Sequence, residues 1–243
     1  MRTLILLLFP LLLAGCYETA PTKELVIGKG SRIDVLNSRH HFAPNHIPAG
    51  WVIEGRDKET VFSNRGKLPN IYMNRRDGVK GVHIQSGQAD FVLARYQDTR
   101  VLVTPFLVWN WHVSEHKGLH HPVRLLVGFY GGNPQSPPLQ GDRMVWHGDG
   151  LPPFDRVLAI GYDQTALKRG NLYPMGQVKY YVQRGGLEQT NRWHNEAVDL
   201  SLLYQQAWPT DHVGTAKITF IGMASTPSAD DGGITFSTID LIR

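Results

Sequence analysis

One short segment of the chain carries residue types that could bind a metal. Residues 112–116 read H-x-x-E-H, with His112, Glu115 and His116 at the three defined positions. Inverzincin metalloproteases use the two histidines of this motif as zinc ligands and the glutamate as general base. Four-residue spacing aligns two histidines on a helix, but here the motif follows a Trp-rich apolar run and leads into Gly118 and Pro122. This context predicts a strand followed by a loop. We therefore favour a solvated loop over a zinc site.

Two further groups of residues have metal-binding character. His120 and His121 lie in the same loop, and imidazole is a common ligand of transition metals. Asp230 and Asp231 precede two glycines and could offer carboxylates to Ca²⁺, although a turn before the last strand explains the same residues. We predict no cofactor. Zinc at His112 and His116 and calcium at Asp230 and Asp231 remain the open alternatives.

The apolar segment 106–113 alternates with a period of two. Trp109 and Trp111 share one face of the predicted strand, and Asn110 and His112 share the other. We expect the tryptophans to pack in the core, which leaves Asn110 and His112 as a polar pair on the opposite surface of the sheet.

A charge and an aromatic residue stand out in the next part of the chain. Arg124 interrupts the otherwise apolar run 123–130, and a charge in such a strand needs a partner. Trp146 lies in the Gly- and Pro-rich stretch 131–153, a loop long enough to be functional, and an exposed ring can stack on a sugar. The predicted ligand-binding residues are therefore Asn110, His112, Arg124 and Trp146.

The first residues are typical of a secretion signal. Arg2 precedes the apolar run Leu4–Leu13, which is shorter than the ~20 residues that a membrane-spanning helix needs. Leu13-Ala14-Gly15-Cys16 resembles the lipobox of bacterial lipoproteins, in which the cysteine thiol carries the lipid. Cys16 is the chain's one cysteine, so no disulfide can form within the chain.

This segment divides the chain into a signal peptide, residues 1–15, an acylated tether, 16–23, and a single domain, 24–243. By resemblance to lipoprotein sorting rules, Tyr17 after the cysteine favours the outer membrane, facing the periplasm, if the host is Gram-negative. We expect a lipid-anchored protein of the cell envelope whose membrane contact is the lipid on Cys16.

The domain has the pattern of an all-β protein, with short apolar runs separated by Gly, Pro, Asn and Asp. One helix is predicted, with Asp199 as N-cap, an apolar stripe through Leu200, Leu203 and Tyr204, and an end before Pro209. The expected fold is an antiparallel two-sheet β-sandwich of jelly-roll (galactose-binding-like) type with one packed helix. The predicted strands are 24–28, 32–36, 51–54, 61–63, 71–74, 81–85, 90–95, 106–113, 123–130, 156–162, 177–183, 216–224 and 234–242.

Several segments together resemble the uncharacterised bacterial family DUF3047, a set of envelope proteins without an established activity. The resemblance covers about residues 50–241. It is carried by Gly50-Trp51, the Pro-x-Leu-x-Trp-x-Trp pattern of 105–111, the Arg-containing strand 123–129, and the region from Trp193 to Tyr204. The chain departs from the family at 225–233, where the family has an Asp-x-Asp-Asn-Thr turn, and at Asn110, where a basic residue is commoner.

Other features narrow the function. The chain has a net charge of +4 but no block of Lys and Arg, which argues against a nucleic-acid partner. It has no G-x-S-x-G elbow, no phosphate-binding Gly loop and no C-x-x-C-H motif. We favour a non-catalytic envelope protein that binds a glycan or another cell-surface polymer. The alternatives are a metal-dependent or carboxylate-based hydrolase and a structural subunit bound to another envelope protein.

Overall fold

The computed structural model describes residues 32–43, 46–55, 71–87, 90–138, 145–147 (backbone only), 151–175, 178–229 and 232–243. The predicted signal peptide, Cys16, the tether, the strands 24–28 and 61–63, and Asp230 and Asp231 lie outside the described residues. The described elements are β1 (Arg32–Leu36), β2 (Trp51–Gly55), β3 (Ile71–Arg76), β4 (Val79–Gln85), β5 (Phe91–Arg100), β6 (Phe106–Val113), β7 (Val123–Tyr130), β8 (Val145–His147), β9 (Arg156–Asp163), β10 (Leu172–Met175), β11 (Val178–Gly185), β12 (Arg192–Asp199), α2 (Leu200–Ala207), β13 (Lys217–Ser225) and β14 (Gly233–Ile242), with short 3-10 helices at Ala166–Lys168 and Leu187–Gln189.

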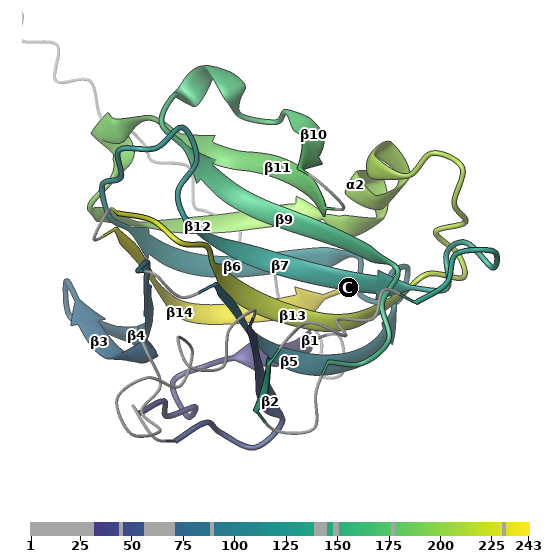
Figure 1. Cartoon of the computed structure of the whole chain (residues 1–243), viewed down its shortest axis with the longest axis horizontal. Helices are drawn as coiled ribbons and strands as arrows, with labels where there is room; N and C mark the ends of the chain where they lie inside the picture. Colours follow the sequence, from purple (N-terminus) through teal and green to yellow (C-terminus); the bar gives the residue numbers. More distant parts are fainter. Residues whose placement is uncertain are drawn as a thin grey trace, which may run out of the picture.

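The strands form two sheets packed face to face, as Figure 1 shows. A six-stranded sheet has the order β12-β6-β14-β4-β3, with β1 also paired to β14, and an eight-stranded sheet has the order β10-β11-β9-β7-β13-β5-β2-β8. This confirms the predicted two-sheet β-sandwich with one packed helix. One detail differs from the expectation, because β9 and β11 pair in parallel within an otherwise antiparallel sheet.

Most strands with an apolar face agree with the prediction, whereas β8, β10 and β12 are not among the predicted strands. β6 and β7 have the predicted bounds. The core-facing positions of β12 include the polar residues His194 and Glu196. Glu196 accepts hydrogen bonds from Gln183 and Arg184 of β11, so its burial depends on partners distant in the sequence.

The helix begins and packs as expected. The Asp199 carboxylate accepts hydrogen bonds from the backbone N–H groups of Ser201 and Leu202, which caps the first turn of α2. Tyr204 packs edge-on against Phe129 of β7, with ring centroids 5.1 Å apart. Within the described residues, no helix is long and apolar enough to cross a membrane.

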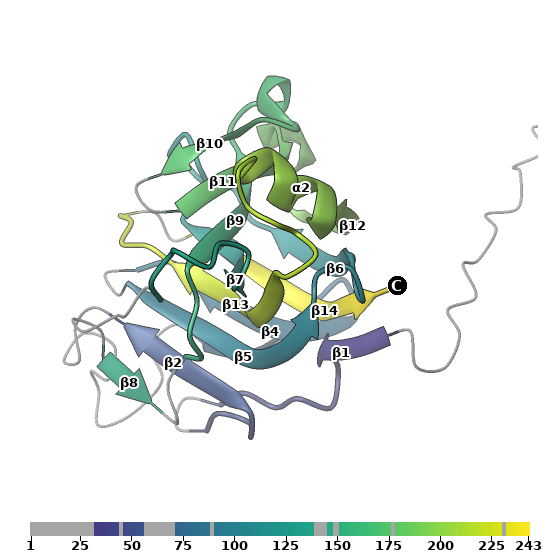
Figure 2. The same cartoon turned by 90° about the vertical axis from the view of Figure 1, so that its right-hand side faces the viewer.

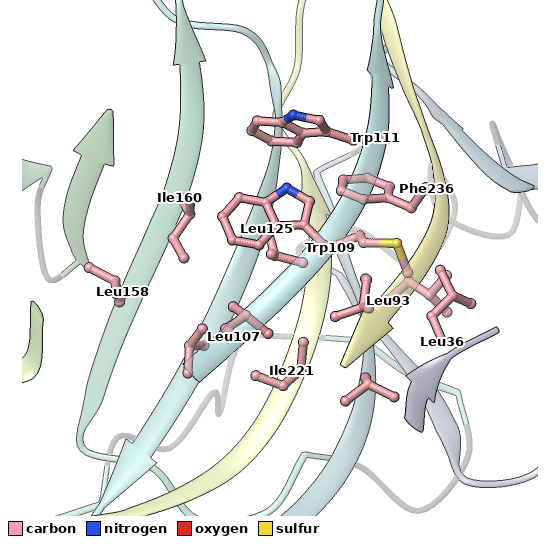
Figure 3. Close-up of a cluster of buried hydrophobic side chains, with 14 of the residues drawn as sticks. Leu36, Leu93, Leu107, Trp109, Trp111, Leu125, Leu158, Ile160, Ile221 and Phe236 are labelled. Carbon is pink, nitrogen blue, oxygen red and sulfur yellow. The ribbon is translucent and has the colours of Figure 1, made fainter. Parts of the chain in front are cut away.

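The main core lies between the sheets (Figure 3). Trp109 and Trp111 point into it from β6, in a T-shaped pair with ring centroids 5.5 Å apart, and Phe236 of β14 packs beside Trp111. Both tryptophans are buried, as predicted. A second, smaller apolar cluster covers the outer face of the eight-stranded sheet and includes Leu126, Tyr180 and Phe220. The outer face of this sheet is therefore largely buried too.

The register gives the sandwich two distinct ends. We call the base the end where β1 and β6 begin and β14 finishes, since Arg32, Ile242 and Phe106 are neighbours across these strands. We call the tip the opposite end, where β6 finishes at Val113 and β9 at Asp163. In Figure 2 the start of β1 and the C-terminus lie on the same side of the molecule. The β5–β6 turn and α2 also belong to the base.

Candidate functional site

The four predicted binding residues do not form one site. Asn110 and His112 lie on the outer face of the six-stranded sheet, opposite the two core tryptophans of β6. Arg124 lies on the outer face of the eight-stranded sheet, on the other side of the sandwich. Trp146 belongs to β8, where its backbone pairs with Glu54, and its side chain is outside the described residues.

A row of polar and aromatic residues crosses the outer face of the six-stranded sheet. Tyr72, His83, Thr235, His112 and Trp193 are in register on β3, β4, β14, β6 and β12. The rings of Tyr72 and His83 are 5.0 Å apart, His83 Nδ1 is 2.9 Å from Thr235 Oγ1, and His112 packs edge-on against Trp193 at 5.6 Å. The polar face of β6 predicted from the sequence is thus part of a larger row.

The β3–β4 hairpin bends over this row. Asp77 Oδ2 at the hairpin turn lies 3.7 Å from His112 Nε2, and the Trp193 indole N–H donates to the Arg76 carbonyl at 3.0 Å. Gly81 permits the bend, since a Cβ there would collide with the backbone of β14. Burial lowers the pKa of His112. His112 is therefore buried beside the hairpin turn, whereas Tyr72 at the other end of the row is 36% exposed.

Arg124 has a different environment. Its Nη1 donates to Met175 Sδ at 3.0 Å, its Nη2 donates to Thr226 Oγ1 at 3.4 Å, and the guanidinium lies 5.6 Å from the centroid of the Tyr180 ring. Its Nε is buried and has no hydrogen-bond partner. In the described part of the chain, no carboxylate is within ion-pair distance of Arg124. Burial lowers its pKa, while Tyr180, Asp90 and other neighbouring groups act in the opposite direction.

A hydrogen-bonded network lies beside Arg124. The Asp163 carboxylate is buried and contacts His120 Nδ1 at 2.7 Å, while the hydroxyls of Tyr180 and Tyr173 donate to it at 2.9 Å and 3.3 Å. Burial, followed by the Asp163 charge, raises the pKa of Tyr173 to about 12 and also raises that of Tyr180. Both tyrosines therefore stay protonated at neutral pH. The His120 side chain is 20% exposed, so this network reaches the surface.

Backbone contacts hold the network in place. The His121 N–H donates to the Tyr162 carbonyl at 2.8 Å, and the Gln164 N–H donates to the Leu119 carbonyl at 2.9 Å, so the β6–β7 loop lies along the end of β9. Gly161 leaves space for the Tyr180 hydroxyl, which a Cβ would overlap. We refer to Arg124, His120, Asp163, Tyr173 and Tyr180 as the Arg124 site.

A buried carboxyl group lies on the same face of the eight-stranded sheet. Glu54 pairs with Val92, which is followed across the sheet by Ala224 and Arg124. Three strand spacings separate the Glu54 and Arg124 backbones by about 14 Å. Neither carboxyl oxygen of Glu54 has a hydrogen-bond partner, and burial raises its pKa to about 7. Glu54 and Arg124 therefore lie on either side of Val92 and Ala224 on this face of the sheet.

A cavity of about 720 Å³ opens at the tip, next to the end of β9. One wall contains Gln164, which directly follows Asp163, and another contains Glu115, whose carboxylate accepts a hydrogen bond from Asn191 at 3.1 Å. The remaining lining residues are Ser114, His116, Lys117, Leu187, Ala229 and Gly232. The cavity and the Arg124 site share the tip of the sandwich.

The H-x-x-E-H segment takes the predicted strand-to-loop course. His112 packs edge-on against Trp193 at the outer sheet face, whereas the buried His116 lies in the loop, with its ring 5.0 Å from that of His121 and 6.0 Å from that of Tyr162. The two histidines of the motif therefore have different surroundings. Among the described residues, no group of three His, Cys, Asp or Glu side chains is arranged to hold a metal ion.

Arg124 is a predicted binding residue, but its neighbours are not. His120 is one of several histidines in its loop, and Asp163, Tyr173 and Tyr180 lie 43 to 60 residues after His120 in the chain. The sequence holds one weak indication of Asp163, because this carboxylate ends a strand whose other residues are almost all apolar. Pairing that carboxylate with His120 requires the register between the loop and β9.

Comparison with known proteins leaves the family open. No family model matches the chain, and no curated protein matches it. Similar solved structures include the K2 cleaved adhesin domain of Lys-gingipain, with 12% identity over 87% of this chain and 98% of that chain (TM-score 0.42). A native family 12 xyloglucanase from Bacillus licheniformis has 9% identity over 88% and 100% (TM-score 0.39). The carbohydrate-binding module TmCBM27, described for mannan recognition, has 14% identity over 72% and 81% (TM-score 0.28).

Proposed function

We propose that this protein is a lipid-anchored envelope protein that binds an acidic glycan through the Arg124 site. The observation that supports a ligand there is the environment of Arg124. Its side chain is partly buried, its buried Nε has no partner, and its other donors contact a thioether and a hydroxyl rather than a carboxylate. The lipid anchor is supported by the sequence around Cys16.

A buried guanidinium favours an anionic partner. Arginine stays charged at any physiological pH, and among the described residues the Asp90 and Asp163 carboxylates act on Arg124 without forming an ion pair with it, which leaves the guanidinium open to a ligand anion. A ligand carboxylate can accept two parallel N–H bonds from the guanidinium, which is the strongest geometry available to it. A sugar acid carries such a group, so the site favours an acidic over a neutral glycan.

The neighbours of Arg124 suit the rest of a sugar. Tyr173 and His120 lie near the surface with their rings 5.6 Å apart, and both carry polar atoms that can hydrogen-bond hydroxyl groups. Aromatic rings of this kind present an apolar face and a polar edge to a ligand. Asp163 fixes both side chains, so little ordering is needed when a ligand binds.

The test is binding of the processed protein to a polyuronate, compared with the same polymer after its carboxyl groups have been reduced to alcohols. Isothermal titration calorimetry should detect the acid form and show at least 10-fold weaker binding of the reduced form. Arg124→Gln should weaken binding to the acid form by about 10- to 100-fold, the range expected for lost charge-assisted hydrogen bonds.

Arg169→Gln is the matched control, because Arg169 is an exposed arginine in the turn after Ala166–Lys168. It should bind like the unmodified protein. Equal binding of the acid and reduced polymers, or an unchanged affinity in a folded Arg124→Gln variant, would contradict the proposal. A preference for poly(glycerol phosphate) over the polyuronate would change the ligand class to a phosphate polymer.

A carboxylate-based hydrolase is the second candidate, and Glu54 favours it. A carboxyl group with a pKa of about 7 can act as a general acid near neutral pH. Asp90 immediately precedes β5, whose Val92 pairs with Glu54, so a second carboxyl group lies on the strand next to Glu54. Glycosidases use two carboxyl groups that flank the scissile bond. Release of reducing ends that disappears in Glu54→Gln would establish this activity.

A further inference from the structure

The base of the sandwich carries a group of exposed apolar side chains. Leu102 and Val103, in the turn between β5 and β6, are 53% and 54% exposed, Phe106 at the start of β6 is 39% exposed, and Leu202 of α2 is 51% exposed. We call these four residues the basal rim. They occupy neighbouring segments, because the Leu200 N–H donates to the Pro105 carbonyl at 2.7 Å.

The turn that carries Leu102 and Val103 is held by buried residues on both sides. Val101 and Thr104, which bracket Leu102 and Val103, are buried. The Val101 N–H donates to the Ala216 carbonyl at 3.0 Å, and Thr104 Oγ1 lies 3.3 Å from Thr99 Oγ1. Because both anchor residues are held inside, the turn presents Leu102 and Val103 to the surroundings. Exposed apolar clusters of this kind mark contact surfaces.

The position of the rim indicates what it contacts. Arg32 pairs with Ile242, which pairs with Phe106, so the chain enters β1 about two strand spacings, ~10 Å, from the rim. About sixteen residues lead from Cys16 to Arg32, so the lipid attaches no more than about 55 Å of chain from the start of β1. A lipid on Cys16 would therefore tether the molecule by its base.

The opposite end of the molecule carries the proposed binding site. Arg124 is near the start of β7 and Asp163 at the end of β9, both at the tip. An eight-residue strand spans about 25 Å, so a molecule resting on its base presents the tip away from the membrane. This orientation leaves the Arg124 site open to a polymer in the envelope.

We infer that the basal rim inserts its apolar side chains into the interfacial region of the lipid bilayer. This inference rests on the lipid anchor of the proposed function and is independent of the glycan. Leucine, valine and phenylalanine side chains favour this region, where removal from water stabilises contact. The rim then fixes the orientation of a domain that the tether alone would leave free to rotate.

The experiment uses the full chain, produced in a lipoprotein-processing bacterial host and reconstituted into phosphatidylethanolamine and phosphatidylglycerol vesicles. The variant Val103→Cys is labelled with an environment-sensitive nitrobenzoxadiazole dye, since the acylated Cys16 cannot react. Leu167→Cys, at an exposed tip position, is the matched control. We expect a blue shift of about 10–20 nm and quenching by nitroxide-labelled lipid at 103, with neither at 167.

Each outcome has a separate meaning. Vesicle-bound protein in which neither label responds would overturn the rim and leave the anchor intact. Absence of acyl chains on Cys16 by mass spectrometry would overturn the anchor and the membrane contact together. A shift at 103 that appears without vesicles and rises with protein concentration would make the rim an interface between two copies of the chain. A second variant, Leu102→Ser with Leu202→Ser, should abolish the response at 103 without affecting glycan binding.

Discussion

Glu54 should make the stability of this protein depend on pH near neutrality. It is fully buried in β2, and burial raises its pKa from 4.5 to about 7. In the unfolded chain the carboxyl group ionises near pH 4.5, whereas in the folded protein it resists ionisation until about pH 7. A raised folded-state pKa means that folding is favoured at low pH and that this stabilisation is lost as the pH rises through 7.

The size of the effect follows from the two pKa values. One pKa unit corresponds to about 1.36 kcal/mol, so the full shift amounts to roughly 3 kcal/mol between acidic and alkaline limits. Between pH 5 and pH 8 the group alone lowers the free energy of unfolding by roughly 2 to 3 kcal/mol. Glu54→Gln removes the ionisation and keeps the shape of the side chain.

Urea denaturation at pH 5 and pH 8 measures this difference. The decrease in the free energy of unfolding from pH 5 to pH 8 should be smaller in Glu54→Gln than in the unmodified protein by roughly 2 to 3 kcal/mol. Glu188→Gln, at an exposed position, is the control and should leave the pH dependence unchanged. If Glu54→Gln and the unmodified protein show the same pH dependence, Glu54 does not ionise in the folded state as its burial implies.

Two further predictions concern stability. The Asp211 side chain is buried and accepts hydrogen bonds from Arg156 and Tyr204. Asp211→Asn should lower the free energy of unfolding by roughly 3 kcal/mol, because it removes the carboxylate that pairs with Arg156. An unchanged urea midpoint would show that this network contributes little. Asp199→Ala removes the N-cap of α2 and should cost about 1 kcal/mol by the same measurement, with Asp98→Ala as an exposed comparison expected to cost less.

On the outer face of the eight-stranded sheet, the sequence predicts some residues of the site and not others. Arg124 was recognised because a charge in an apolar strand needs an explanation, and the structure places it on a largely buried face. Glu54 was missed, although it too interrupts an apolar run, because one carboxylate in a short strand has an ordinary solvent-exposed interpretation. His120 and Asp163 became a pair only through the contact between the β6–β7 loop and β9.

The sequence by itself determined the β-sandwich class, the bounds of β6, β7 and α2, and the inward direction of Trp109 and Trp111. These features follow from local patterns, because the period of two and the N-cap depend on residues close together in the chain. The tertiary structure decided which faces are covered, how the β3–β4 hairpin buries His112, and which side chains surround Arg124. Those depend on register and on contacts between distant segments, whose geometry is set by the packing of the two sheets.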